Sequence, residues 1–147
     1  MRHAGTAIYI HLVWATWDRL PLLVDETKEL AYRAIGAECE KMGTEIVALG
    51  GVEDHVHLLM KFSPLVTLSD VIKQIKGASS HLVTHTFPAN FFKWQGAYGA
   101  VSVSPRHLSD ISGYIAKQPE HHAAGYLIPE WELPPKASPS TGRPSAP

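Results

Sequence analysis

The sequence lacks the features of a secreted, membrane-spanning or disulfide-bonded protein. Its one cysteine, Cys39, excludes an intramolecular disulfide and any zinc site built from several cysteines. No apolar run approaches the ~20 residues needed to cross a bilayer. The N-terminus shows neither the apolar region nor the cleavage site of a signal peptide. We therefore expect a cytoplasmic protein that does not enter a membrane.

An excess of charge of either sign is also missing. The chain has 13 Lys and Arg against 14 Asp and Glu, and its isoelectric point is near 6.7. A strongly basic chain would by itself indicate nucleic-acid binding. Any nucleic-acid site must here be a local patch. With 147 residues, of which 45% are hydrophobic, the composition is that of one ordinary globular domain.

The order of predicted elements favours an α+β fold. Alternating or periodic apolar residues predict strands over 6–17, 44–52 (broken at Gly50-Gly51), 55–62 and 97–103, and helices over 25–42 and 67–85, the second capped by Thr67. Ser104 followed by Pro105 predicts the cap of a last helix that runs from Arg106 to Gln118.

This β-α-β-β-α-β order with a C-terminal helix is the ferredoxin-like arrangement of an antiparallel sheet. Helices would cover one face of the sheet and leave the other face for a ligand or a partner. Residues 1–133 would form the domain, and the Pro- and Ser-rich segment 134–147 would be a disordered tail.

The segment Asp-His-Val-His-Leu-Leu-Met at 54–60 carries the most informative pattern. In a strand, His55 and His57 point to the same face, roughly 6–7 Å apart, and can converge on one divalent metal ion. Imidazole binds several transition metals, so the pair does not name one. If the first and third strands pair, His11 lies beside them. The alternative is two solvent-facing or hydrogen-bonded histidines.

Tyr114 and Gln118 lie four residues apart, on one face of the predicted last helix. A tyrosine hydroxyl can be a nucleophile, and a glutamine carbonyl oxygen can complete a metal site. The alternative is a tyrosine at the edge of the core. Pro119 disfavours helical geometry at Gln118 and favours an end or a kink of the helix there.

Taken together, five motifs resemble the single-tyrosine HUH transposases of small bacterial insertion sequences and their REP-associated relatives. The motifs are YIHLVWATWDRLPLL from Tyr9, DHVHLLM from Asp54, KGASS from Lys76, KWQGAYGAVSVSP from Lys93 and YIAKQPEHH from Tyr114. They cover about residues 7–122, in order.

The resemblance implies a mechanism. His55 and His57 would hold Mg²⁺ or Mn²⁺, with Gln118 as a further ligand, and the metal would act as a Lewis acid on the scissile phosphate. Tyr114 would attack single-stranded DNA that carries hairpins and leave a 5′-phosphotyrosine link with a free 3′-hydroxyl. The resemblance also implies a homodimer in which the tyrosine helix can serve the partner's metal site. The strand at 97–103 is the expected junction.

Phosphate contacts are expected from polar side chains of the second helix and from basic residues elsewhere, namely Lys73, Lys76, Ser79, Ser80, Arg19, Lys93 and Arg106. The alternative for the helix is a solvated face. In one respect the chain departs from the family. Relatives commonly continue with a further helix, whereas the segment 125–132 contains Pro129 and gives way to the Pro/Ser-rich tail.

Two other functions stay open at the level of sequence. One is a domesticated relative that binds and nicks repeated hairpins without moving an element of its own. The other is a non-catalytic, dimeric binding module of ferredoxin-like fold, in which the histidines are incidental.

Overall fold

The computed structural model describes residues 5–125 and 131–132. Its strands are β1 (Tyr9–Ala15), β2 (Glu45–Val52), β3 (His55–Lys61) and β4 (Gly99–Val103), and its α-helices are α1 (Asp25–Lys41), α2 (Leu68–Thr86), α3 (Leu108–Ala116) and α4 (Gln118–Ala124). Short 3₁₀ helices precede α1 and α3, at η1 (Trp17–Arg19) and η2 (Pro105–His107).

The strands form one antiparallel sheet in the order β2-β3-β1-β4. This topology confirms the predicted ferredoxin-like α+β fold. The structure also tests two details of the sequence prediction. The Thr67 hydroxyl accepts a hydrogen bond from the Asp70 amide at 3.1 Å, as a helix cap should. The predicted break at Gly50-Gly51 is wrong, because β2 continues to Val52 and its irregularity lies between Ile46 and Ala48.

The prediction of one continuous helix from Arg106 to Gln118 is also wrong. Ser104 makes no side-chain cap bond and precedes η2 instead of an α-helix. At the other end α3 stops at Ala116, and α4 begins at Gln118 with Pro119 in its first turn. Pro119 has no N–H for the carbonyl of Ile115, and its ring would collide with that carbonyl in a continuous helix. The chain therefore breaks at Lys117, and α4 takes a new direction.

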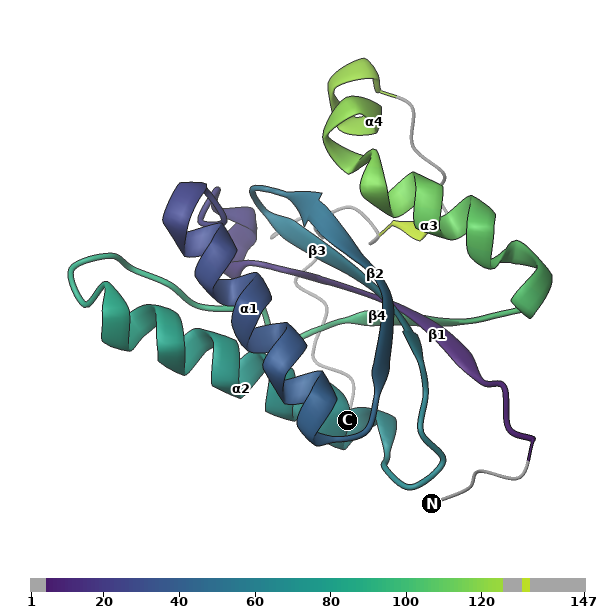
Figure 1. The fold of residues 1–147 in the computed structure, drawn as a ribbon. Coiled ribbons are helices and arrows are strands. Elements are labelled where there is room, and N and C mark those ends of the chain that lie inside the picture. The colour runs from purple at the N-terminus through teal and green to yellow at the C-terminus, as the bar shows by residue number, and fades with distance from the viewer. Residues whose placement is uncertain (1–4, 126–130, 133–147) are drawn as a thin grey trace, which may run out of the picture.

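Helices cover both faces of the sheet (Figure 1). Helices α1 and α2 lie on one face, over the fully buried Leu12 and Trp14 of β1. On the opposite face Ile111 and Ile115 of α3 pack with Leu59 of β3. The predicted open face is therefore covered, because it carries apolar as well as histidine side chains.

A glycine on β2 permits the close approach of α3. A Cβ atom at Gly50 would lie 2.7 Å from the carbonyl oxygen of Ile115. Gly50 is paired with His57 in the sheet, so the contact holds α3 against β2 at the position next to the histidine pair of β3.

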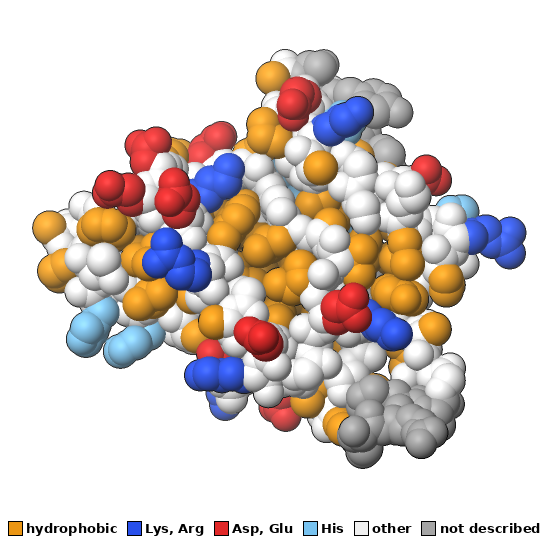
Figure 2. Space-filling model, in the orientation of Figure 1, with side chains coloured by type: hydrophobic (Ala, Val, Ile, Leu, Met, Phe, Trp, Pro, Cys, Tyr) orange, Lys and Arg blue, Asp and Glu red, His pale blue; other side chains and the backbone are white. Residues whose placement is uncertain are grey.

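The face seen in Figure 2 has no concentrated basic patch. Acidic and basic side chains are interspersed on it, and hydrophobic side chains gather across its middle, where the sheet lies between the two helical layers. Within the described residues, none of the helices has the length and hydropathy that a membrane span requires. The predicted tail at 134–147 lies outside the described residues.

Substitution Gly50→Ala should destabilise the protein by ~1–3 kcal/mol, because the new methyl group forces α3 away from β2. Gly36→Ala is the control, since a Cβ atom at Gly36 of α1 meets nothing within 4 Å. That change should instead stabilise the helix by ~0.5–1 kcal/mol. Urea unfolding measures both, and a Gly50→Ala protein as stable as the unsubstituted one would show that α3 does not pack as described.

Candidate active site

His55 and His57 of β3 lie side by side on the face beneath α3. Their rings are 5.0 Å apart between centroids, and both side chains are almost completely buried. Each has a buried Nε2 atom without a hydrogen bond among the described residues. A buried polar atom without a partner is costly, so two of them pointing to one place indicate a ligand.

The other nitrogen of each ring is held by a neighbour. Asp54 lies 2.8 Å from Nδ1 of His55, and Nε2 of His11 lies 2.9 Å from Nδ1 of His57. His11 is on β1, which pairs with β3, so the predicted neighbourhood of the three histidines is confirmed. Such second partners fix the orientation of a metal-binding imidazole.

The carboxylate of Glu132, which follows α4 in the chain, lies beside both of these Nε2 atoms. Oε1 of Glu132 lies 3.3 Å from Nε2 of His55 and 3.4 Å from Nε2 of His57. It also lies 3.6 Å from Nε2 of His122 on α4. Together His55, His57, His122 and Glu132 place one potential ligand atom each within 4.8 Å of one another.

Tyr114 of α3 lies against this cluster. Its ring centroid is 6.0 Å from that of His57, and its hydroxyl donates a hydrogen bond to Oε2 of Glu132. Trp131 packs edge-on against the Tyr114 ring, at 4.9 Å between centroids. The tyrosine and both strand histidines thus meet within a single chain.

Gln118, the first residue of α4, is fully buried in the same cluster. Nε2 of His122 lies 2.9 Å from its Oε1 atom, and its own Nε2 group donates to Glu132 at 3.2 Å. The structure therefore brings Tyr114, His55, His57 and Gln118 together, as the sequence predicted.

The cluster changes the acidity of its members. Burial lowers the pKa of His57, and of His122, and it lowers the pKa of His11 to about 3 with a further contribution from His57. For His55, burial opposes protonation, but the carboxylates of Asp54 and Glu132 outweigh it and raise the pKa to about 9. Burial likewise opposes ionisation of Glu132, but the surrounding donors hold its pKa well below the usual range. The carboxylate is therefore ionised, and three of the four imidazoles are neutral.

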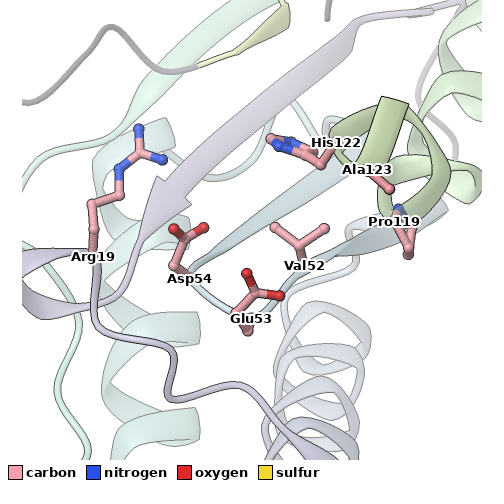
Figure 3. Close-up of a pocket in the computed structure, with 7 residues that line it drawn as sticks. All are labelled: Arg19, Val52, Glu53, Asp54, Pro119, His122 and Ala123. Carbon is pink, nitrogen blue, oxygen red and sulfur yellow. The ribbon is translucent and has the colours of Figure 1, made fainter. Parts of the chain in front are cut away.

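A pocket of about 390 Å³ opens beside the cluster and is lined by Arg19, Val52, Glu53, Asp54, Pro119, His122 and Ala123. Figure 3 shows Arg19 on one side of it and the α4 residues on the other, with the two acidic residues between them. The backbone at Asp18 and Arg19 has φ values of 54° and 56°. This left-handed conformation costs of order 1–2 kcal/mol per residue. The chain thus carries local strain at the turn that presents Arg19.

The residues of α2 that were predicted to contact DNA differ in their accessibility. Lys73 is exposed and Ser80 half-buried, so both are accessible. Ser79 is fully buried, where its hydroxyl donates to the Ile75 carbonyl at 2.6 Å and accepts from the Trp94 indole at 2.9 Å. Its predicted phosphate contact is wrong, because it faces the core.

Lys76 is largely engaged within the protein. Its ammonium group donates to the carbonyls of Gln95, Gly96 and Ala97, at 2.7, 3.3 and 3.2 Å. All three N–H groups thus have acceptors, and the residue supports the loop before β4.

Two further basic residues lie on the surface away from α2. Arg106 is exposed in η2. The ammonium group of Lys93 lies 4.0 Å from the centroid of the Trp17 ring. Trp17 belongs to η1, the short helix that also contains Arg19.

Two site residues were missed at the level of sequence. His122 follows Gln118 at i+4, a spacing that could have indicated it. Glu132 lies in a Gly- and Pro-bounded segment without periodicity, so no local pattern pointed to it.

Comparisons with known proteins identify the family of the chain. Residues 4–118 match the family described as Transposase IS200 like. The chain belongs to this family. The transposase is 28% identical to the ISDra2 transposase TnpA of Deinococcus radiodurans over 114 residues, which are 74% of this chain and 81% of that protein. It is 26% identical to the transposase for insertion sequence element IS200 of Salmonella typhimurium, over 90% of this chain and 89% of that protein.

Solved structures support the fold. A crystal structure of a candidate transposase from D. radiodurans R1 aligns with a TM-score of 0.65 at 31% identity, over 80% of this chain and 95% of that one. The structure of a REP-associated tyrosine transposase bound to a REP hairpin aligns with a TM-score of 0.63 at 17% identity, over 86% and 74% of the two chains. At that identity the second match shows the fold alone.

The donor set of the transposase fits a divalent metal. Two buried imidazole nitrogens without hydrogen bonds face one ionised carboxylate oxygen. Imidazole and carboxylate together suit several divalent metals, so the cluster can bind an ion without naming it.

The buried, neutral state of His11 predicts a pH-dependent stability. Below pH ~6.5 the unfolded chain binds a proton at this residue and the folded chain does not, so stability falls by up to ~1.4 kcal/mol per pH unit. The loss continues until the pH reaches the folded pKa of about 3. Replacing His11 with Gln should make the slope of unfolding free energy against pH shallower, as urea unfolding from pH 7 to pH 4 can measure. Replacing the exposed His107 with Gln is the control, and equal slopes for the two variants would contradict the buried state of His11.

Proposed function

We propose that this transposase cleaves and rejoins single-stranded DNA through Tyr114, with Mg²⁺ or Mn²⁺ held by His55 and His57. One observation carries the proposal. The Tyr114 hydroxyl and the two orphan Nε2 atoms converge on the same carboxylate, Glu132. A tyrosine with a purely structural role would not require two buried histidines and an ionised carboxylate beside it.

The proposed step is an in-line displacement at phosphorus. The Tyr114 oxygen loses its proton and forms a bond to phosphorus, while the bond from phosphorus to the 3′-oxygen breaks and that oxygen takes up a proton. The products are a 5′-phosphotyrosine link and a free 3′-hydroxyl. Attack by another 3′-hydroxyl reverses the step at a new junction. Because the covalent link conserves the energy of the broken ester, no nucleotide cofactor is required.

A divalent metal bound at the histidines supplies positive charge that polarises the scissile phosphate. The protein's own contribution is positioning. Asp54 and His11 orient the two rings, and the packing of α3 on Gly50 holds Tyr114 against them. A nucleophile fixed beside the reacting group avoids much of the entropic cost of the reaction.

The pocket beside the cluster is the proposed place of the DNA backbone. Arg19 lines it opposite His122, so a phosphate there would lie between a guanidinium group and α4. Strain at the Arg19 turn is consistent with a residue held for a ligand. Lys73, Ser80, Lys93 and Arg106 are proposed as outer contacts, whereas Lys76 is proposed to act through the loop that it supports.

The alternatives differ in what they explain. A non-catalytic binding module gives no reason for two buried imidazoles that converge with a tyrosine on one carboxylate. A domesticated hairpin nickase has the same chemistry, and only the DNA flanking the gene separates it from an active element. Matching hairpins at both flanks favour transposition, and dispersed repeats favour the nickase.

Substitution Tyr114→Phe should abolish the covalent protein–DNA adduct, with a fall of at least ~10³-fold in its rate of formation. The variant loses one oxygen and keeps the ring that packs on His57 and Trp131. Denaturing gel electrophoresis of protein incubated with Mn²⁺ and hairpin-bearing single-stranded DNA detects the adduct. Tyr98→Phe, at an exposed residue just before β4, is the matched control and should form it normally. An adduct that persists in Tyr114→Phe would remove the assignment.

We also propose that the transposase is a homodimer joined at β4. This strand is at the edge of the sheet, and Ala100, Val101 and Ser102 are exposed on it. An open edge with small and β-branched side chains favours pairing with a second copy. Light scattering at micromolar concentration should give about twice the chain mass of 16.1 kDa. A mass of one chain would exclude the dimer and any sharing of sites between subunits.

A further inference from the structure

The two oxygens of the Glu132 carboxylate have different partners. Oε1 faces the Nε2 atoms of His55 and His57 at 3.3 and 3.4 Å, while Oε2 accepts hydrogen bonds from Tyr114 and Gln118. The side chain is only 10% exposed although its residue lies in the segment beyond α4. A buried carboxylate requires partners, and those of Glu132 are the proposed nucleophile and the proposed metal-binding histidines.

The amide of Gln118 bridges His122 and Glu132. Its carbonyl oxygen accepts the Nε2–H of His122 at 2.9 Å, and its NH₂ group points to Glu132 at 3.2 Å. An NH₂ group repels a cation and attracts a carboxylate. The order His122, Gln118, Glu132 is therefore a chain of donors that ends on Oε2 of Glu132 and leaves Oε1 for the histidine side.

The chemistry of the donors favours the carboxylate as well. Mg²⁺ and Mn²⁺ are bound preferentially through oxygen, and an anionic oxygen neutralises part of their charge whereas an amide oxygen does not.

We infer that Glu132 is the carboxylate ligand of the metal site, and that its second oxygen positions the Tyr114 hydroxyl next to that metal. Gln118 and His122 are then positioning residues that orient Glu132. The ligand role follows from the cluster itself, whereas the role toward Tyr114 rests on the proposed function. Metal and nucleophile would thus be joined through one side chain from outside the β-α-β-β-α-β core.

Manganese affinity tests the ligand role without any cleavage assay. Mn²⁺ binding to the full chain is measured by electron paramagnetic resonance, which counts the free ion. His81 and His85, an exposed imidazole pair on α2 with centroids 4.8 Å apart, are replaced by Asn in every protein so that they do not bind metal. In this background Glu132→Gln should raise the dissociation constant at least about tenfold. Glu120→Gln, at an exposed residue of α4, is the matched control and should change it less than about twofold.

The conservative variant Glu132→Asp keeps the charge and should bind Mn²⁺ more tightly than Glu132→Gln. Affinity of Glu132→Gln equal to that of the control overturns the ligand role. The double variant His55→Gln with His57→Gln separates this failure from that of the proposed function. If the double variant also binds normally, the metal site of the proposed function is wrong. If only the double variant loses binding, the histidine site stands and Glu132 is not its ligand.

A measurement on the unsubstituted side chain covers the case in which the variants do not fold. With ¹³C-labelled glutamate, the carboxyl resonance of Glu132 should shift on addition of Mg²⁺, while that of Glu29, exposed on α1, should not. An unmoved Glu132 resonance at saturating Mg²⁺ overturns the inference.

A separate NMR measurement tests whether Glu132 positions the Tyr114 hydroxyl. With ¹³Cζ-labelled tyrosine, the Tyr114 resonance should shift in Glu132→Gln and recover toward its original position in Glu132→Asp, but should not shift in Glu120→Gln. A Tyr114 resonance that is the same in all four proteins shows that Glu132 does not hold the hydroxyl.

Discussion

Two ring nitrogens, Nε2 of His55 and Nε2 of His57, are buried between the sheet and α3 without a hydrogen bond from the described residues. Burial of such atoms is costly unless something binds them. The nitrogens on the far sides of the rings are held by Asp54 and His11, so the rings cannot turn away without losing those partners. The other features of the site follow from this constraint, because whatever satisfies the pair has to reach it in a covered place.

The fold meets the requirement by closing a second layer over the histidine face. Gly50 lets the backbone of α3 approach β2 closely, which brings Tyr114 over His57. The break at Lys117, enforced by Pro119, then turns α4 so that Gln118 and His122 face the same cluster.

Much of this could be predicted from the sequence, for physical reasons. Period-two alternation in β1 and β3 determines which side chains share a face, so His11, His55 and His57 could be grouped before any coordinates. The i, i+4 spacing placed Tyr114 with Gln118, and Pro119 indicated a break nearby. The cover provided by α3 could not be foreseen, because the strand pattern shows which residues are apolar but not which helix buries them. Ser79 looked like a phosphate contact because its neighbours are polar, whereas its burial depends on the distant Trp94. The place of Glu132 in the site could not be predicted from the sequence, because it arises from tertiary contacts alone.

The chain belongs to the IS200-like transposases, and the geometry of its site is consistent with the proposed DNA cleavage. This member of a transposase family carries a tyrosine and two buried imidazoles at one carboxylate, within a single chain. The most direct test is a crystal of the protein soaked with Mn²⁺ and measured at the manganese absorption edge. We predict one strong anomalous peak within bonding distance of Nε2 of both His55 and His57, with the Tyr114 hydroxyl of the same chain beside it. A map without a peak at that position, or with the tyrosine far from it, would show that this cluster is not the metal site beside the nucleophile.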